Sequence, residues 1–336
     1  MAMRRNILGR QWIALLVVVC LFPIPSVLAV PFRGLSLNDI MTAYGFGPPS
    51  EYGPSMVFRS RTSTVVFESG SRRVLFNGLT LYLNRSVEKT PGTWLIAPVD
   101  AADTLGALCY PGQVLKKVGG GTVVLDAGHG GSDPGTQGVA RYPEKVFTLD
   151  LAKRVRAKLR ECQTTVWLTR NQDAAMSLEE RCWRAGKLGA DVFVSIHFNA
   201  SRNSSISGIE TFIVPAAGCP TTAEAERQRS SSRVTACPGN RFDGANAVLA
   251  HFLQKGLLAH SRAEDRGIRR ARFYVIRNAS CPAALVECGF LSNAREAKRI
   301  SDPAYRDQLA EGLARGILTY MNRVREMSLP PVRVSE

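Results

Sequence analysis

The stretches TVVLDAGHGG (122–131) and DVFVSIHFNA (191–200) decide the fold of this chain. Each is an apolar run of strand length that ends near a histidine, His129 in the first and His197 in the second. Glycines surround His129, so the backbone can turn sharply there and something can approach it closely. A third apolar run, AALVECGF (283–290), carries Glu287 near its end. Ligands of α/β sheets collect beyond the carboxyl ends of the strands, so these side chains predict a site assembled from separate strands.

The second half of the chain alternates strand and helix patterns, which favours an α/β sheet with helices on both faces. Short apolar runs predict the strands, and longer segments of helical periodicity predict the helices. We expect strands over 122–127, 164–168, 191–197, 208–214, 273–276 and 283–288, and helices over 144–160, 177–188, 245–260 and 303–321.

Two histidines and two glutamates of this chain have the chemistry of a zinc hydrolase site. Neutral imidazole nitrogen and carboxylate oxygen are the ligands of catalytic zinc, which takes three protein groups and a water, with a further carboxylate left to carry protons. A lone histidine near an apolar run is more often a core or surface residue than a ligand. The chain has only four histidines, however, and two of them occur in this setting, with Glu144 and Glu287 as the carboxylates.

These residues belong to a longer series of sequence blocks that match a known protein family. The chain resembles the zinc-dependent N-acetylmuramoyl-L-alanine amidases, which cut peptidoglycan and have a phosphorylase/hydrolase-like α/β fold. The resemblance covers residues 120 to about 322. The blocks occur in family order, with Glu144 after the first: VVLDAGHGGSDPGTQG (123–138), VWLTR (166–170), SLEER (177–181), ADVFVSIHFNAS (190–201), GIETFIVP (208–215), DRGIRRARFYVIRN (265–278) and PAALVECGFLSN (282–293).

The resemblance implies a role for each site residue. His129, Glu144 and His197 would hold Zn²⁺, and Glu287 would act as general base and then general acid. The bond cut would be the amide between the lactyl group of N-acetylmuramic acid and L-alanine. The residues alone support only zinc-dependent amide hydrolysis, so two alternatives stay open: a zinc peptidase that cuts within the stem peptide, and a non-catalytic wall-binding protein.

Other polar residues near these runs have two interpretations each. Asn199 either contacts substrate or forms a turn at the strand end. Asp126 either orients a ligand histidine through its second nitrogen or caps a turn. Five residues are interpreted as structural or non-catalytic: Arg170 and Arg181 as ion-pair partners, His251 and His260 as helix residues without catalytic roles, and Cys288 as part of the core.

The first 29 residues are typical of a signal peptide. Arginines at the start, an apolar stretch over 12–22 and the small-residue site Val27-Leu28-Ala29 predict cleavage after Ala29. Pro23 and Pro25 end the apolar stretch short of the roughly 20 residues that a membrane span needs. We therefore expect a periplasmic or secreted protein without a stable membrane anchor after cleavage. Arg4-Arg5 also fits a twin-arginine export signal.

Residues 30–118 predict a small β-rich module that precedes the catalytic domain. Apolar runs over 64–67 and 73–83, broken at Asn77-Gly78, predict a β-hairpin, and 94–109 predict a short strand and a short helix. This pattern resembles the copper-amine-oxidase-like N-terminal domains, which implies wall attachment or positioning. No histidine lies before His129, so we expect no metal chemistry in this module. The predicted division is a linker at 119–121, a catalytic domain over 122–322 and a tail over 323–336.

The formal charge of +15 favours an anionic partner. For an exported chain that partner is the peptidoglycan wall, whereas scattered arginines without a helix-turn-helix or RNP signature disfavour nucleic acid. The cluster Arg266, Arg269, Arg270 and Arg272 forms either a solvated face or a contact with substrate carboxylates or phosphates. Related division amidases often carry an inhibitory helix after the GIETF-like strand, so an activating cell-division protein is a further candidate partner.

The cysteines after residue 29 are odd in number, so at least one thiol is free or pairs with another molecule. Cys219 and Cys237 are each followed by proline and bracket a segment with little apolar content. A disulfide between them would close this loop in an oxidising compartment. The alternative is two unpaired loop cysteines.

Overall fold

The computed structural model describes residues 34–115, 121–139, 142–228 and 235–328. The described residues from Gly34 onward form one compact unit. The predicted signal peptide over 1–29 lies outside the described residues. In the part of the chain that the structure describes, no helix combines the length and the apolar character needed to cross a membrane.

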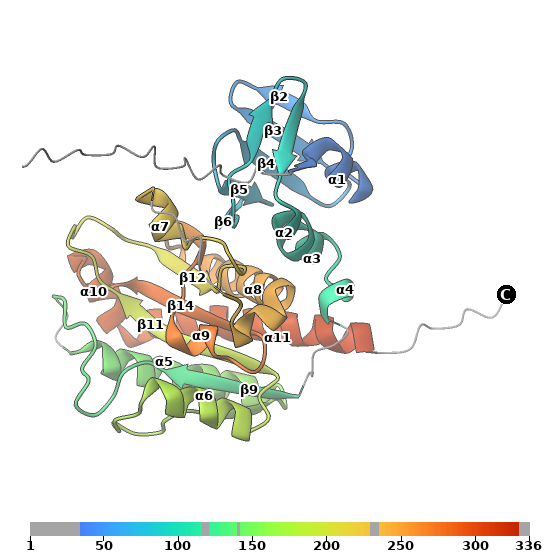
Figure 1. The fold of residues 1–336 in the computed structure, drawn as a ribbon. Helices are drawn as coiled ribbons and strands as arrows, with labels where there is room; N and C mark the ends of the chain where they lie inside the picture. The colour runs from blue at the N-terminus through green and yellow to red at the C-terminus, as the bar shows by residue number, and fades with distance from the viewer. Residues whose placement is uncertain (1–33, 116–120, 140–141, 229–234, 329–336) are drawn as a thin grey trace, which may run out of the picture. The chain divides into compact units, whose positions relative to one another are not determined.

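The second half of the chain contributes six strands to a mixed sheet (Figure 1). In sheet order the strands are β10 (Thr165–Leu168), β9 (Thr122–Ala127), β11 (Val192–Asn199), β14 (Ala283–Phe290), β12 (Ile209–Ile213) and β13 (Asp265–Arg270). The first four of these strands run parallel to one another, whereas β12 is antiparallel to β14 and β13 is parallel to β12.

Helices cover both faces of this sheet, which confirms the predicted fold class. Alternate residues of one strand point to opposite faces. Accordingly, Val123 and Leu125 of β9 pack in a core with α5 (Glu144–Glu161), α8 (Asp243–Ser261) and α11 (Pro303–Ser328). Val124 instead packs with α6 (Leu178–Lys187) and α9 (Tyr274–Arg277) on the other face.

The predicted β-hairpin region is confirmed, and its strands continue the same sheet. β6 (Leu79–Tyr82) pairs with β13 in parallel through Leu81 and Ile268, and β5 (Arg73–Phe76), β4 (Thr64–Glu68), β3 (Ser55–Arg59) and β2 (Ser50–Tyr52) follow in order. The division of the chain at 119–121 stays a prediction, and residues 119 and 120 lie outside the described part. The other elements before residue 116 are β1 (Leu35–Ser36), α1 (Leu37–Ala43), β7 (Glu88–Thr90), β8 (Thr93–Ile96), α2 (Pro98–Asp100), the π-helix η1 (Ala101–Gly106), α3 (Ala107–Cys109) and α4 (Gly112–Leu115).

One predicted strand is wrong. Residues 273–276 were expected to be extended, but Tyr274–Arg277 form the short helix α9, and the strand is the arginine-rich β13 just before it. An apolar run of four residues does not distinguish a strand from a helical turn. After residue 121, three further short elements of the described chain were not predicted: α7 (Thr222–Glu226), the 3₁₀ helix η2 (Pro238–Phe242) and α10 (Ala294–Ser301).

The predicted disulfide is also wrong, because Cys219 and Cys237 are both free thiols. Polar contacts hold the start of this loop instead. Arg272 donates to the Cys219 carbonyl at 2.6 Å, and Arg72 donates to the carbonyl of Thr221 at 3.0 Å. The Cys237 thiol lies 3.1 Å from the Asn240 side-chain oxygen at the start of η2.

Candidate active site

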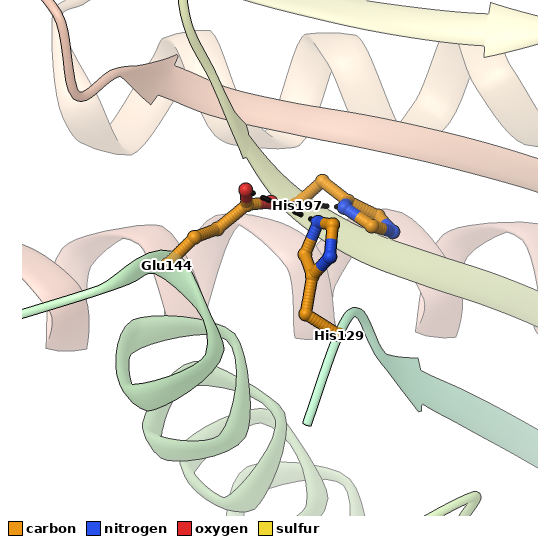
Figure 2. A group of neighbouring side chains, drawn as sticks. All are labelled: His129, Glu144 and His197. Carbon is orange, nitrogen blue, oxygen red and sulfur yellow. Dashed lines mark hydrogen bonds and ion pairs between the residues drawn. The ribbon is translucent and has the colours of Figure 1, made fainter. Parts of the chain in front are cut away.

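Three of the predicted site residues converge at one end of the sheet (Figure 2). His129 follows β9, His197 lies in β11, and Glu144 is the first residue of α5. The Glu144 carboxylate lies 3.1 Å from Nε2 of His129 and 2.9 Å from Nδ1 of His197. One ligand atom from each residue lies within 4.8 Å of the other two, so the group could hold a metal ion.

Glu144 is a buried carboxylate surrounded by two imidazole nitrogens and two backbone donors. Its side chain accepts hydrogen bonds from the backbone N–H of Thr136 at 2.9 Å and of Phe198 at 3.0 Å. Burial alone would raise the pKa of Glu144, but the hydrogen bonds with His129 and His197 lower this pKa well below its ordinary value. The residue is therefore ionised and concentrates negative charge between the two imidazoles.

The loop that carries His129 is held by two buried arginines. His129 has a φ of 60°, in the left-handed region. Arg181 donates to the carbonyls of Ala127 and His129, each at 2.8 Å, and Arg170 donates to the carbonyls of Ala127 and Gly128, each at 2.9 Å. These bonds fix three consecutive carbonyls and so define the position of the His129 ring.

A carboxylate does orient His129, but the predicted candidate for it is wrong. Asp126 bonds Arg181, Thr169 and Ser195, each at 2.7 Å, and makes an ion pair with Arg181. Nδ1 of His129 instead lies 2.7 Å from Asp133. The left-handed backbone at His129 turns the chain so that the residue four positions later reaches the ring, and periodicity along β9 could not reveal that turn.

Glu287 lies beside the cluster on the neighbouring strand. Its Cα is in register with that of His197, and residues in register on adjacent strands point to the same face. Within the described part of the chain, its Oε2 is buried without a hydrogen-bond partner. Burial, and then the charges of Glu144 and Glu210, raise the pKa of Glu287 well above its ordinary value. Such a carboxyl can carry a proton near neutral pH. Cys288 points to the opposite face and is fully buried, as predicted.

A polar network that was not predicted from the sequence lies beside Glu287. Glu210 of β12 is directly opposite Glu287 in the sheet and only 5% exposed. Its carboxylate accepts hydrogen bonds from Asn199 at 3.2 Å and from Nε of Arg266 at 2.9 Å. The carboxylate in the apolar run GIETFIVP was the signal for this residue, because a glutamate is costly to bury without partners.

Two other arginines of the predicted cluster and the other two histidines contact residues outside the site. Arg270 is buried and donates to the side chain of Thr104 at 2.9 Å, and Arg272 pairs with Glu224 at 2.7 Å. His251 packs edge-on against Phe76, and His260 bonds the carbonyl four residues earlier in α8. Neither histidine belongs to the cluster of Figure 2.

A cavity of about 420 Å³ opens next to the cluster, between the sheet and helices α6 and α9. His129 and His197 line it together with Leu178, Phe273 and Tyr274. Leu178 is 50% exposed and Phe273 is 39% exposed, so apolar surface faces solvent directly beside the histidines. A substrate that reaches the cluster can therefore bury uncharged groups in this cavity.

Comparison with known proteins places this site in a family. The model of the N-acetylmuramoyl-L-alanine amidase family, Amidase_3, matches residues 123–319. The chain is similar to the N-acetylmuramoyl-L-alanine amidase LytC of Bacillus subtilis, with 29% identity over 292 residues. That match covers 85% of this chain but 51% of LytC, so the chain spans about half the length of this relative.

Solved structures agree with the family match. The amidase AmiC2 of Nostoc punctiforme is 32% identical, with a TM-score of 0.51 over 61% of this chain and 99% of that one. The CwlD amidase of Clostridioides difficile, solved in complex with the GerS lipoprotein, is 26% identical, with a TM-score of 0.50 over 60% of this chain and 99% of that one. The chain belongs to the N-acetylmuramoyl-L-alanine amidase family.

Proposed function

We propose that this chain is a zinc-dependent enzyme that hydrolyses the amide between N-acetylmuramic acid and L-alanine in peptidoglycan. The observation that carries the proposal is the convergence of His129, Glu144 and His197 beside a protonatable Glu287. The match to the amidase family supports the substrate.

The residues of the cluster fit a zinc ion. Two imidazoles and one carboxylate are three protein ligands, which is the number typical of catalytic zinc sites with one position left open. The ionised state of Glu144 supplies the negative charge that a divalent cation needs. Asp133 on the second nitrogen of His129 is the usual support of a ligand histidine, because it fixes the tautomer and the ring orientation.

Zinc, when bound, would polarise the scissile carbonyl and lower the pKa of a coordinated water. Glu287 would accept a proton from the attacking water and return it to the nitrogen of the departing L-alanine. Its raised pKa suits both steps, since a catalytic acid and base works best with a pKa near the operating pH. Asp133 would keep His129 in place while the proton moves.

The site of action follows from the same proposal. We propose that residues 1–29 direct export and that the charge of +15 draws the mature enzyme to the anionic wall. The CwlD amidase was solved in complex with a lipoprotein, which supports control of this chain by a partner protein as well.

The decisive experiment uses the mature chain, residues 30–336, on purified peptidoglycan sacculi. We expect soluble stem peptides that begin with a free L-alanine amino group, loss of their release after treatment with a chelator, and recovery on adding zinc. A peptidase would instead leave alanine attached to the glycan. A wall-binding protein would sediment with the sacculi and release nothing, and either result would contradict the proposal.

A further inference from the structure

Arg266 of β13 is held in a fixed position two strands from Glu287. Its Nε donates to Glu210, whose Cα is paired with that of Glu287. Its guanidinium carbon lies 5.2 Å from the centre of the Phe290 ring. A Cβ at Gly208 would come within 2.8 Å of the Arg266 side chain, so the glycine leaves the space that the aliphatic part of this arginine fills.

The terminal amino groups of Arg266 remain available for a ligand. A guanidinium has five N–H donors, and Glu210 accepts from the Nε donor. No hydrogen bond joins either terminal amino group to any residue in the described part of the chain, and the side chain is 23% exposed. An arginine that is anchored at Nε and stacked on a ring presents a ready fork for two carboxylate oxygens.

We propose that Arg266 binds a carboxylate of the stem peptide, on the L-alanine side of the amide that is cut. This inference rests on the proposed function. It adds a substrate-binding residue that selects a charged peptide, and it assigns the direction in which the substrate lies across the sheet.

The distances suit this assignment. Neighbouring strands lie about 4.8 Å apart, so β13 is about 10 Å from β14 across the sheet. An extended peptide advances about 3.5 Å per residue, so a carboxylate carried by the residue after alanine, on a side chain or at the chain end, can reach from the scissile bond to Arg266.

The charges also favour the peptide over the glycan. The N-acetylhexosamine units of the glycan are uncharged, and the carboxyl of muramic acid is consumed in the amide, so that side offers no anion. The cavity on the β9 side of the cluster has apolar surface from Leu178 and Phe273, and its arginine, Arg181, is already paired with Asp126. Uncharged groups therefore suit that side, and the free cationic donors lie on the other.

The test compares two soluble substrates that differ only in charge: N-acetylmuramoyl-L-alanyl-D-glutamate, and the same compound with both carboxyl groups converted to amides. The variants are Arg266→Gln and Arg266→Lys. The control is Arg323→Gln, which removes the same charge from an exposed residue of α11 that pairs with Glu326. Thermal unfolding of each variant establishes that it is folded.

We expect Arg266→Gln to lower kcat/KM for the carboxylate substrate by about 10- to 100-fold, the usual effect of losing a hydrogen-bonded charge, and to leave the amide substrate unchanged. The kcat/KM of Arg266→Lys for the carboxylate substrate should lie between those of the parent and Arg266→Gln, since lysine keeps the charge but lacks the two-pronged guanidinium. Arg323→Gln should behave as the parent does. Calorimetric titration with the product dipeptide L-alanyl-D-glutamate should show the same loss of affinity for Arg266→Gln.

Equal losses on both substrates would give Arg266 a purely structural role, and no loss on either would remove it from the binding site. Either result overturns the inference and leaves the proposed function intact. If the parent enzyme cleaves neither soluble substrate and releases nothing from sacculi, the proposed function is wrong. The dipeptide titration still decides the role of Arg266 in that case, because equal binding by parent and Arg266→Gln refutes it.

Discussion

Replacing Gly128 with alanine should disable the metal site without removing any ligand. Gly128 precedes His129 and lies against the ring of His197. An alanine Cβ at this position would lie 2.2 Å from Cε1, 2.4 Å from Nε2 and 2.6 Å from Nδ1 of His197. Carbon atoms in contact are normally about 3.5 to 4.0 Å apart, so the ring or the backbone has to move by about 1 Å or more.

The backbone at Gly128 has little freedom to move. Its N–H donates to the Ile196 carbonyl at 3.1 Å, and its own carbonyl accepts from Thr148 at 2.8 Å and from Arg170 at 2.9 Å. The displacement therefore falls on the His197 ring. A zinc–nitrogen bond is about 2.0 to 2.1 Å long and tolerates deviations of about 0.2 Å, so a displaced ring leaves the coordination sphere.

We expect Gly128→Ala to lose most of its zinc on dialysis and at least about 100-fold in kcat/KM, since a misplacement of 1 Å costs on that order. Overpacking should also lower the free energy of unfolding of the metal-free chain by about 1 to 3 kcal/mol. The measurements are zinc content by atomic emission and the rate of sacculus hydrolysis.

The matched control is Gly186→Ala in helix α6, where the new Cβ would meet only the Ser280 hydroxyl, at 3.4 Å. This variant should keep the zinc and the rate of the parent. Parental zinc content and rate in Gly128→Ala would show that the site accommodates the methyl group, and the steric reasoning would be wrong.

Three further predictions concern single side chains. Removing either histidine ligand, His129→Ala or His197→Ala, should abolish stoichiometric zinc and activity, and full zinc occupancy in a purified variant would take that residue out of the ligand set. Glu287→Gln should keep zinc but lower kcat by about 10²- to 10⁴-fold, and a parental rate would assign the proton transfer to another residue. Burial, and then Lys255, lower the pKa of His251 to about 4, so the unfolded chain takes up a proton between pH 6.5 and 4 that the folded chain does not. The contribution of neutral His251 to the free energy of unfolding is therefore complete above pH 6.5 and is lost as the pH falls, at a cost on the order of 3 kcal/mol. Urea unfolding at pH 7 and pH 4 should show that His251→Leu loses less free energy of unfolding in acid than the parent does. Equal losses in the two proteins would refute the pKa shift.

The sequence predicted those parts of the site that depend on regular strands and helices. His197 and Glu287 lie within long apolar runs whose period of two fixes the face of each side chain, and Glu144 begins a helix with a clear pattern. The resemblance to a family then supplied the roles. These residues are brought together by the order of the strands in the sheet, which the apolar runs do not specify.

The strand that carries Arg266 and the contact between Asp133 and His129 were missed, because they depend on features that periodicity does not encode. Arg266 lies in a strand of six residues, four of them charged, that is stable because Glu210 and Glu226 pair with its arginines. A charged run of this kind looks like a loop in the sequence. Asp133 reaches His129 because the backbone turns through a left-handed conformation at His129. The glycines beside His129 predicted a sharp turn, but they did not indicate which residue would reach the ring.

The buried arginines Arg170 and Arg181 determine how the proposed zinc site would respond to loss of its metal. Three carbonyls of the ligand loop are tied to Arg170 and Arg181, not to the ion, so the loop keeps its shape when zinc is withdrawn. Small zinc-dependent domains unfold when a chelator removes their metal, and refolding delays their return. This chain should instead switch off as an intact protein and recover at the rate at which zinc arrives.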